Sequence, residues 1–497
     1  MEKFEDRLTR YMDAGLPLLY VDTFEEEKAI EIIRKVFRER GVAEWNIRGF
    51  FDHQSNAAML EQSLADTLEL LLSDENNLAR KVLVLKSPHF FLEEPAVVER
   101  LKQIAQKIND GTIEECTVIC IAPIVKIPIE LESYLTILTM DFLTPKEIRD
   151  IISGFVRECG LPPLQEDFQD ELATMFKGMS ETAIQNVLAL AVADDGEINH
   201  ADLPLIFEQK QQMIKKSGIL DMVPIRESID DIGGLENLKK WLRRKAEVFK
   251  NITKAQNFGV DVPKGVLIAG MPGCGKSLNA KAAAQLFGVP LLRMDMGRLM
   301  GKYVGESEGN MRRAIALAEA SSPCVLWIDE LEKAFAGIGG GGGGAEVTTR
   351  LFGNFLTWLQ EKDSLAFVVA TANNIADLPP ELLRKGRFDE IFYVGLPNDD
   401  ERRKIFSIHI GKRRNQDLGS IDLQQLVSKT EGYSGADIEG VVRDSIEDAF
   451  ASHKTSVTTD DILRAISNTH SLSEIMKDSL DKMSKIYKER KFKNASA

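Results

Sequence analysis

Short apolar runs, each ended by glycine or polar residues, recur along the chain and alternate with segments that read as helices. Residues 16–22, 81–87, 266–269 and 324–328 are such runs and are rich in Val, Ile and Leu. Between them lie segments such as residues 277–288, SLNAKAAAQLFG, which predict a helix. Short continuous apolar runs are typical of strands buried on both faces. The alternation predicts an α/β fold built on parallel sheets.

Length and composition indicate a globular chain with several domains. The chain has 497 residues, 44% of them hydrophobic and 28% charged, so we expect more than one packed core. The formal net charge is −15. This acidic balance argues against a general affinity for nucleic acid, because phosphate binding needs a basic face, although a local basic patch is compatible with it.

Cysteine usage and the start of the sequence favour a cytoplasmic protein. The cysteines have no paired spacing, as expected in a reducing compartment: Cys116, Cys120, Cys159, Cys274 and Cys324. Residues 1–10, MEKFEDRLTR, lack the apolar core of a signal peptide, and no run of about 18 apolar residues predicts a membrane span. The six histidines lack ligand spacing, so no structural zinc site is expected.

The stretch GMPGCGKS at residues 270–277 follows one of the apolar runs and precedes a helix. It matches G-x-x-x-x-G-K-[ST], in which glycines let backbone N–H groups surround phosphates. Lys276 would reach the β and γ oxygens, and the Ser277 hydroxyl would bind Mg²⁺. The loop therefore predicts ATP and Mg²⁺ as cofactors. Its predicted contact residues are Gly270, Pro272, Gly273, Cys274, Gly275, Lys276, Ser277 and Leu278.

Residues 324–330, CVLWIDE, predict a buried strand that ends in two carboxylates. Asp329 would hold Mg²⁺ together with Ser277, and Glu330 would polarise the attacking water. A strand that ends in acids by chance is the competing interpretation. The order of loop, strand and double acid favours the catalytic one.

The stretch FVVATANNIADLPPELLRKGRFD, residues 367–389, resembles the AAA family of ATPases. In that family a polar residue at the end of this strand senses the γ-phosphate, and counting back from Arg384 selects Asn373 over Asn374. The family writes A-T-N where this chain has A-T-A-N, which leaves that choice open. The resemblance also implies that Arg384 and Arg387 act on the nucleotide of a neighbouring subunit.

Two further stretches carry the same resemblance. DIGG at residues 231–234 resembles the segment that contacts adenine, which implies roles for Asp231, Ile232 and Gly233. EGYSGADIEGVV at residues 431–442 resembles the helical lid, with Gly435 and Ala436 over the base. The resemblance covers roughly residues 225–470. It implies a P-loop (AAA+) parallel-sheet core with a C-terminal helical lid, assembled as a six-membered ring.

Residues 299–308, LMGKYVGESE, bear on the substrate. In protein-threading AAA enzymes this stretch lies at the central pore, which implies that Lys302, Tyr303 and Val304 grip an extended polypeptide. An aromatic ring offers apolar contact with little entropy to lose. A surface tyrosine is the alternative. The run Gly339–Gly344 is either a second pore loop or a flexible linker.

The N-terminal half repeats the plan of the second half without its chemistry. Residues 127–152 parallel residues 378–406, and the same offset recurs in the following helices, which indicates an internal duplication. TFEEEKA stands where the phosphate loop would fall, and Lys86 and Ser87 stand where the two acids would be. This half is predicted to be a degenerate AAA-like α/β module with its own small helical subdomain. The alternative is an unrelated α/β adaptor domain.

Together these features predict an ATPase with five segments. They also resemble a little-characterised AAA family of cyanobacteria, algal plastids and other bacteria, which makes the plastid stroma a second possible location. The favoured function is ATP-driven remodelling, unfolding or threading of protein substrates by a homo-oligomer. The alternatives are a nucleic-acid-remodelling ATPase and an ATP-gated scaffold. The segments are 1–215 (degenerate module), 216–228 (linker), 229–397 (ATPase core), 398–470 (lid) and 471–497 (basic helical tail).

Overall fold

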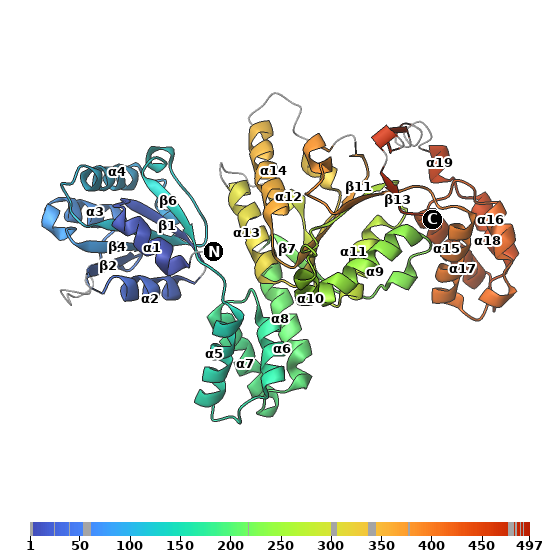
Figure 1. Cartoon of the computed structure of the whole chain (residues 1–497), viewed down its shortest axis with the longest axis horizontal. Helices are drawn as coiled ribbons and strands as arrows, with labels where there is room; N and C mark the ends of the chain where they lie inside the picture. The colour runs from blue at the N-terminus through green and yellow to red at the C-terminus, as the bar shows by residue number, and fades with distance from the viewer. Residues whose placement is uncertain are drawn as a thin grey trace. The chain divides into compact units, whose positions relative to one another are not determined.

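The computed structural model describes residues 3–497 except 24, 39, 53–60, 217, 300–305, 336–343, 376–377, 476–481, 483–484, 488 and 491. The chain divides into two compact units, each built around its own sheet (Figure 1). The first unit comprises Met1–Thr174 and Met179–Glu197, and the second comprises Met175–Gly178 and Ile198–Ala497.

The first unit is an α/β/α sandwich around a six-stranded sheet of order β3-β2-β4-β5-β1-β6. Its strands pair in parallel, except for the antiparallel pair β2 and β3. Leu19 and Val21 pack with helices α1 and α2, whereas Leu18 and Tyr20 pack with α3 and α4. The bounds are β1 (Leu18–Asp22), β2 (Gly41–Asn46), β3 (Gly49–Asp52), β4 (Lys81–Lys86), β5 (Thr117–Ala122), β6 (Leu135–Thr139), α1 (Phe4–Asp13), α2 (Glu26–Val36), α3 (Leu64–Leu72) and α4 (Pro95–Asn109).

Further helices follow this sheet along the chain, and short polar side chains cap the N-termini of two of them. Thr144 forms a capping box with Glu147 at the start of α5, and Ser180 accepts the N–H of Ala183 at the start of α7. Such caps satisfy N–H groups that the first turn of a helix leaves without partners. The bounds are α5 (Pro145–Glu158), α6 (Glu166–Phe176) and α7 (Glu181–Asp195), and the end of α6 belongs to the second unit.

The second unit contains a seven-stranded sheet of order β13-β12-β8-β11-β10-β9-β7, parallel except at β7. One core lies between the sheet and α9 and α11, and the other lies between the sheet and α8, α13 and α14 (Figure 1). The bounds are β7 (Leu220–Val223), β8 (Gly265–Gly270), β9 (Leu291–Met294), β10 (Cys324–Ile328), β11 (Ala366–Ala372), β12 (Glu390–Val394), β13 (Lys493–Asn494), α8 (Leu203–Lys216), α9 (Glu236–Lys250), α10 (Ile252–Asn257), α11 (Lys276–Phe287), α12 (Met296–Leu299), α13 (Glu306–Ala320) and α14 (Gly344–Glu361).

A helical subdomain follows the sheet of the second unit and has its own apolar core. Each of its main helices contributes a buried residue to this core, namely Phe406, Leu426, Val441 and Ile462. Capping boxes at Asn398 and Ser434 begin two of these helices. The bounds are α15 (Asp399–Arg414), α16 (Leu423–Ser428), α17 (Gly435–Ala451), α18 (Thr459–Ser467) and the short α19 (Leu472–Ile475).

The two sheets share one strand order. The strands lie in the order β6-β1-β5-β4-β2 in the first unit and β12-β8-β11-β10-β9 in the second. Among these five strands of either sheet, the one that comes first in the chain lies between the fifth and the fourth, and the third and the second follow. A local detail repeats as well, since Ser87 after β4 and Glu330 after β10 both adopt left-handed φ angles, 50° and 49°. Such a conformation is uncommon outside glycine, so its recurrence at matching positions supports the predicted duplication.

Three segments differ from the boundaries expected from sequence. Helix α8 lies within the predicted module 1–215, yet its Ile214 packs with Leu220 and Met222 in the core of the second unit. The predicted linker 216–228 contains β7, which pairs with β9 because its apolar residues continue that core. The predicted helical tail 471–497 contains β13, which extends the sheet beside β12. Among the described residues, none of the helices combines the length and the apolar content that crossing a bilayer requires.

Candidate functional site

A glycine-containing loop joins β8 to α11 at the carboxyl edge of the sheet. Gly275, with φ of 81°, immediately precedes α11, and Gly273 has a φ of 71°. A Cβ at Gly273 would lie 2.9 Å from Ser434 Oγ. Only glycine adopts such angles at no steric cost, so the two residues let the loop curve back toward the helix. The first turn of α11 is thereby presented as an anion-binding helix N-terminus.

Gly270, at the end of β8, serves strand packing. A Cβ at Gly270 would lie 2.0 Å from the carbonyl oxygen of Val394 on the neighbouring strand β12. The next residue, Met271, donates its N–H to that carbonyl at 3.0 Å. Gly270 is outside the set of residues that line the cavity described below. Its absent side chain lets β8 and β12 approach at the base of the loop.

Lys276 is buried inside this loop. Its ammonium donates to the carbonyl oxygens of Gly270 at 2.9 Å and Met271 at 2.6 Å. Burial lowers the pKa of Lys276 to about 8, against the opposing influence of nearby acidic groups. The side chain lines the cavity, so an anion bound there would receive a charge that the loop already positions.

The acids after β10 are held by a threonine from the adjacent strand. Thr371 Oγ1 donates to Asp329 Oδ1 at 2.5 Å and accepts the N–H of Glu330 at 3.1 Å. Ser277 Oγ donates to the same Asp329 oxygen at 3.2 Å. A hydroxyl and a carboxylate side by side are oxygen donors of the kind that Mg²⁺ prefers. Ser277 and Asp329 therefore fit the predicted metal position.

Glu330 faces the amide of the next strand end. Asn373 Nδ2 donates to Glu330 Oε1 at 3.1 Å, and both residues line the cavity, whereas Asn374 does not. Lys333 forms an ion pair with the other oxygen of Glu330. A carboxylate and an amide that share one edge of a cavity can orient a water molecule between them.

Behind this pair, Glu332 fixes the backbone of Asn373. Its Oε1 accepts the Asn373 N–H at 2.9 Å. The Glu332 side chain is buried, and this burial raises the pKa of the carboxyl group. The amide that contacts Glu330 is thus anchored through the main chain as well as through its side chain.

On the opposite side of the cavity, a short loop precedes α9. Asp231 forms an ion pair with Lys412 at 2.6 Å, and the hydrogen bond from Lys412 is the main cause that lowers the pKa of Asp231 to about 2. The carbonyl of Ile232 accepts from Lys239 at 2.6 Å. A Cβ at Gly233 would lie 2.4 Å from Ile405, so this glycine allows the loop to touch α15. The loop therefore presents its backbone to the cavity.

Helix α15 supplies a wall that the sequence did not predict. Glu401 accepts the buried N–H of Leu235 at 2.9 Å and also closes the capping box with Asn398. Burial lowers the pKa of His409 on the same helix. Residues 401, 405, 408, 409 and 412 recur at helical spacing, and this pattern would have predicted that they share one face of α15. The cavity residues absent from the prediction are Leu235, Gly395, Pro397, Glu401, Ile405, Ile408, His409 and Glu439.

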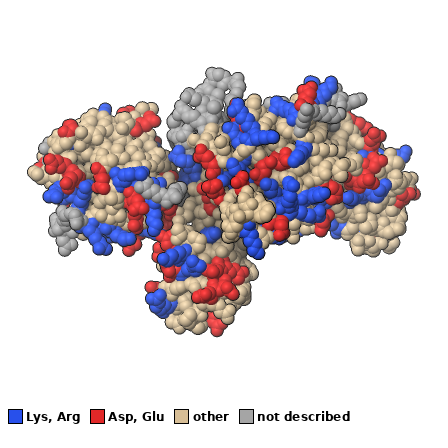
Figure 2. Space-filling model, in the orientation of Figure 1, with Lys and Arg blue, Asp and Glu red and all other residues tan. Residues whose placement is uncertain are grey.

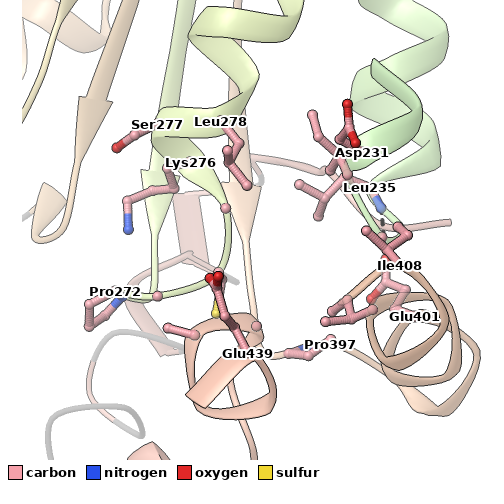
Figure 3. Close-up of a pocket in the computed structure, with 18 of the residues that line it drawn as sticks. Asp231, Leu235, Pro272, Lys276, Ser277, Leu278, Pro397, Glu401, Ile408 and Glu439 are labelled. Carbon is pink, nitrogen blue, oxygen red and sulfur yellow. Dashed lines mark hydrogen bonds between the residues drawn. The ribbon is translucent and has the colours of Figure 1, made fainter. Parts of the chain in front are cut away.

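These elements enclose a cavity of about 450 Å³ between the sheet and the helical subdomain. Figure 3 shows Lys276 and Ser277 on one side, Asp231 and Leu235 opposite, and Glu401 and Glu439 from the helical subdomain closing the space. The lid also contacts the loop directly, because Ala436 donates its N–H to the Gly273 carbonyl at 2.9 Å. The predicted residues that line the cavity are Asp231, Ile232, Gly233, Pro272, Gly273, Cys274, Gly275, Lys276, Ser277, Leu278, Asp329, Glu330, Asn373, Gly435 and Ala436.

Several predicted residues lie elsewhere. Arg384 is exposed and Arg387 is partly exposed, and neither lines the cavity. Lys302, Tyr303 and Val304 lie outside the described residues, as does most of the run Gly339–Gly344. Cys274 lines the cavity, but burial raises the pKa of its thiol to about 11. The thiol is therefore protonated near neutral pH, which does not favour the oxidative switch considered from sequence.

Family models match most of the chain. Residues 266–396 match the ATPase family associated with various cellular activities (AAA), and residues 420–464 match an AAA+ lid domain. Residues 4–140 match the N-terminal domain of SpoVK-like AAA ATPases, and residues 146–217 match the second domain of these proteins. The predicted parallel-sheet core with a helical lid is confirmed by these matches.

Full-length relatives come from algae. The chain is 38% identical over 460 residues to an uncharacterized AAA domain-containing protein ycf46 of Guillardia theta, covering 92% of this chain and 89% of that protein. It is 34% identical over 497 residues to the ycf46 protein of Pyropia yezoensis, covering 99% of both. A shorter match, 37% over 222 residues, is to a cell division cycle protein 48 homolog of Archaeoglobus fulgidus and covers 44% of this chain and 30% of that protein.

Proposed function

The chain belongs to the AAA family of ATPases, and on that premise we propose that it is a Mg²⁺-dependent ATPase that forms a six-membered ring and remodels protein substrates. The observation that carries the proposal is the contact between Asn373 and Glu330 at the edge of a cavity that also contains Lys276 and Asp329. The catalytic carboxylate, its polar partner and the phosphate-binding lysine thus share one space. A cavity that only binds nucleotide needs no such contact between a carboxylate and an amide.

Each residue has a distinct part in the proposed reaction. The first turn of α11 and Lys276 bind the β- and γ-phosphates, and Ser277 and Asp329 hold Mg²⁺. Bound Mg²⁺ neutralises charge on the phosphate oxygens. Glu330 polarises the attacking water, while Asn373 keeps the carboxylate and that water in line with the γ-phosphate.

The base would occupy the other end of the cavity. There the backbone around Ile232 and Gly233 faces Ile405, Ile408 and His409. A backbone edge beside apolar side chains can pair with adenine and pack against its faces. Gly435 and Ala436 bring the lid close to the loop, so nucleotide binding is coupled to the angle of the lid.

The proposed reaction depends on assembly because of two arginines. Arg384 and Arg387 do not line the cavity of their own chain and are exposed or partly exposed, which suits a role at the nucleotide of a neighbouring subunit. An arginine supplied in this way contributes roughly 10³ to 10⁵ in turnover. An isolated chain is therefore expected to hydrolyse ATP slowly.

Protein, rather than nucleic acid, is the proposed substrate. Figure 2 shows Lys and Arg interspersed with Asp and Glu on the visible face, with no continuous basic stripe. The net charge of −15 points the same way. Tyr303, followed by Val304 and GESE, is proposed to grip an extended polypeptide in the pore.

The test is ATP turnover measured against protein concentration, with molecular mass from light scattering. We expect turnover per chain to rise with assembly, and Glu330→Gln to form stable ATP-bound rings without turnover. Arg387→Ala should bind ATP but lose most hydrolysis, and Tyr303→Ala should keep basal turnover but lose stimulation by an unfolded protein. Equal turnover by a monomer would exclude the trans arginine, and stimulation by single-stranded DNA alone would favour the nucleic-acid alternative.

A further inference from the structure

Glu439 lines the nucleotide cavity from the lid helix α17. Its Oε1 accepts a hydrogen bond from Arg413 of α15 at 2.9 Å, and the same oxygen lies 3.8 Å from His409 Nδ1. The hydrogen bond from Arg413 lowers the pKa of Glu439, so the side chain is a carboxylate at neutral pH. Figure 3 shows this carboxylate pointing into the cavity. Helix α15 therefore fixes one oxygen of a side chain that faces the space for the ligand.

The other oxygen of Glu439, Oε2, accepts no hydrogen bond from the residues that the structure describes. In this it differs from Glu401 and Asp231, the carboxylates that adjoin the expected position of the base. Glu401 uses both oxygens for backbone N–H groups, and Asp231 uses one for a lysine and the other for a serine N–H. A carboxylate accepts hydrogen bonds and donates none. Oε2 is therefore available to a ligand group that donates, such as a hydroxyl.

Glu439 lies between the two ends of the cavity. Ala436, one turn earlier on α17, donates its N–H to the Gly273 carbonyl of the phosphate loop at 2.9 Å. Residues three apart share one face of a helix, so Glu439 follows Ala436 along the cavity wall. His409, on the other side of Glu439, belongs to the end proposed for the base. Because the sugar of a nucleotide joins phosphate to base, we expect the sugar opposite Glu439.

We propose that Glu439 is a specificity-determining residue of the nucleotide cavity, whose Oε2 accepts a hydrogen bond from the ribose hydroxyls of ATP. Arg413 holds the other oxygen and thereby orients the carboxylate toward the sugar. An acidic side chain binds ribose hydroxyls in the same way in dinucleotide-binding sheets. A deoxyribose lacks one of these donors, so the contact favours ribonucleotides. This assignment rests on the proposed ATPase function and names the part of the nucleotide that the lid helix contacts.

The experiment measures binding of ADP, 2′-deoxy-ADP and 3′-deoxy-ADP to the full chain in the presence of Mg²⁺, by isothermal titration. We expect wild type to bind ADP about tenfold more tightly than the weaker-binding deoxy analogue, as one charge-assisted hydrogen bond at a half-exposed site allows. Glu439→Ala should bind ADP about tenfold more weakly than wild type and prefer it over either analogue by less than about twofold. The assignment is overturned if wild type shows no preference or if Glu439→Ala keeps it.

A control on the same helix separates the contact from a general effect of charge. Asp444 pairs with Arg443 at 3.3 Å and does not line the cavity. Asp444→Ala therefore removes a carboxylate and an ion pair from α17 and should keep the full preference for ADP. If the carboxylate of Glu439 only held the lid in place, Glu439→Ala would weaken all three nucleotides by one factor and leave their ratio unchanged.

The orienting ion pair has a test of its own. Arg413→Ala keeps the Glu439 carboxylate but releases its Oε1. The preference for ADP should fall to about threefold, between the values for wild type and Glu439→Ala, because the acceptor remains without its fixed direction. A preference equal to that of wild type would contradict the orienting role of Arg413.

These outcomes are distinct from failure of the ATPase proposal, because binding of a diphosphate requires no turnover. A wild-type chain that prefers ADP over its deoxy analogues but hydrolyses no ATP at any concentration would overturn the ATPase and leave the ribose contact standing. A chain that hydrolyses ATP but binds the three diphosphates equally would overturn the ribose contact alone. A chain that binds none of them would overturn both.

Discussion

The two sheets of this protein have the same strand order but carry side chains of opposite charge at matching positions. In the second unit, Lys276 begins the helix α11 after the first core strand, and Asp329 and Glu330 follow β10. In the first unit, acids begin α2 and a lysine ends β4. Lys86 lies 3.4 Å from Glu27 and 4.0 Å from Glu26, and also pairs with Glu44 at 3.4 Å.

This inversion makes the first unit an unfavourable place for a phosphate. A phosphate needs N–H groups and a positive charge at the helix N-terminus. In the first unit that position holds carboxylates, and burial raises the pKa of both Glu25 and Glu26. The connection is also shorter, since residues 23–25 replace residues 271–275. Lys86 pairs with Glu26 and Glu27, so part of the negative charge at this position is balanced within the unit itself.

The largest expected difference between the two units is in nucleotide binding. Among the described residues, Lys276 is the one lysine that lines the nucleotide cavity. Lys276→Ala removes its buried charge pair with the phosphates of ATP, and a loss of about 3 kcal/mol should weaken ATP binding about 100-fold. Lys86→Ala should leave ATP affinity unchanged. Isothermal titration with a non-hydrolysable ATP analogue measures both.

The matched variant Lys86→Ala has a different readout. It leaves Glu44, whose side chain is 8% exposed, with one cation fewer and should lower the unfolding temperature of the first unit. An ATP affinity that fell equally in Lys86→Ala and Lys276→Ala would break the comparison, since it would mean that the first unit also binds nucleotide.

A smaller effect concerns pH. Because burial lowers the pKa of Lys276 to about 8, the ligand-free protein loses most of this charge as pH rises from about 7 to 9, whereas the unfolded chain keeps it until about 10.4. The fold therefore gains stability over that window while ATP binding, which needs the charge, weakens about tenfold between pH 7 and pH 9. Lys276→Arg should remove the pH dependence because arginine stays charged. A flat profile in wild type would contradict the lowered pKa.

The sequence predicted the second unit well because its chemistry is local. Residues 270–278 form one loop and the acids end one strand, so spacing alone identifies them. An internal duplication was also predicted, through the parallel between residues 127–152 and 378–406, and the strand order that the two sheets share agrees with it. What escaped prediction depends on tertiary contact. Glu401 matters because its helix packs on the loop at Leu235, and Ala495 matters because it pairs with β12.

A modest effect is expected at the rim of the cavity. In the first unit Lys86 pairs with the exposed Glu27 at the start of α2, whereas in the second unit the Asp231–Lys412 pair fixes a loop beside the cavity. Lys412 is about half exposed, so Lys412→Ala should cost about 0.5–1 kcal/mol and raise the KM for ATP twofold to fivefold, with kcat unchanged. Lys454→Ala, which removes a lid ion pair with Asp461 at 2.5 Å, is the control and should leave the KM unchanged. A changed kcat in Lys412→Ala would place the pair in catalysis instead.

The smallest expected effect is at Cys274. Both units bury thiols, and burial raises the pKa of Cys120 to about 12 and that of Cys274 to about 11. Oxidation requires the thiolate, so at neutral pH the thiol of the nucleotide loop should resist peroxide as well as the thiols of the first unit do. Wild type and Cys274→Ala should lose the same small fraction of ATPase activity after exposure to hydrogen peroxide. If only wild type lost activity and a thiol reductant restored it, the loop would carry a redox switch that the first unit lacks, and the two units would then differ in regulation as well as in charge.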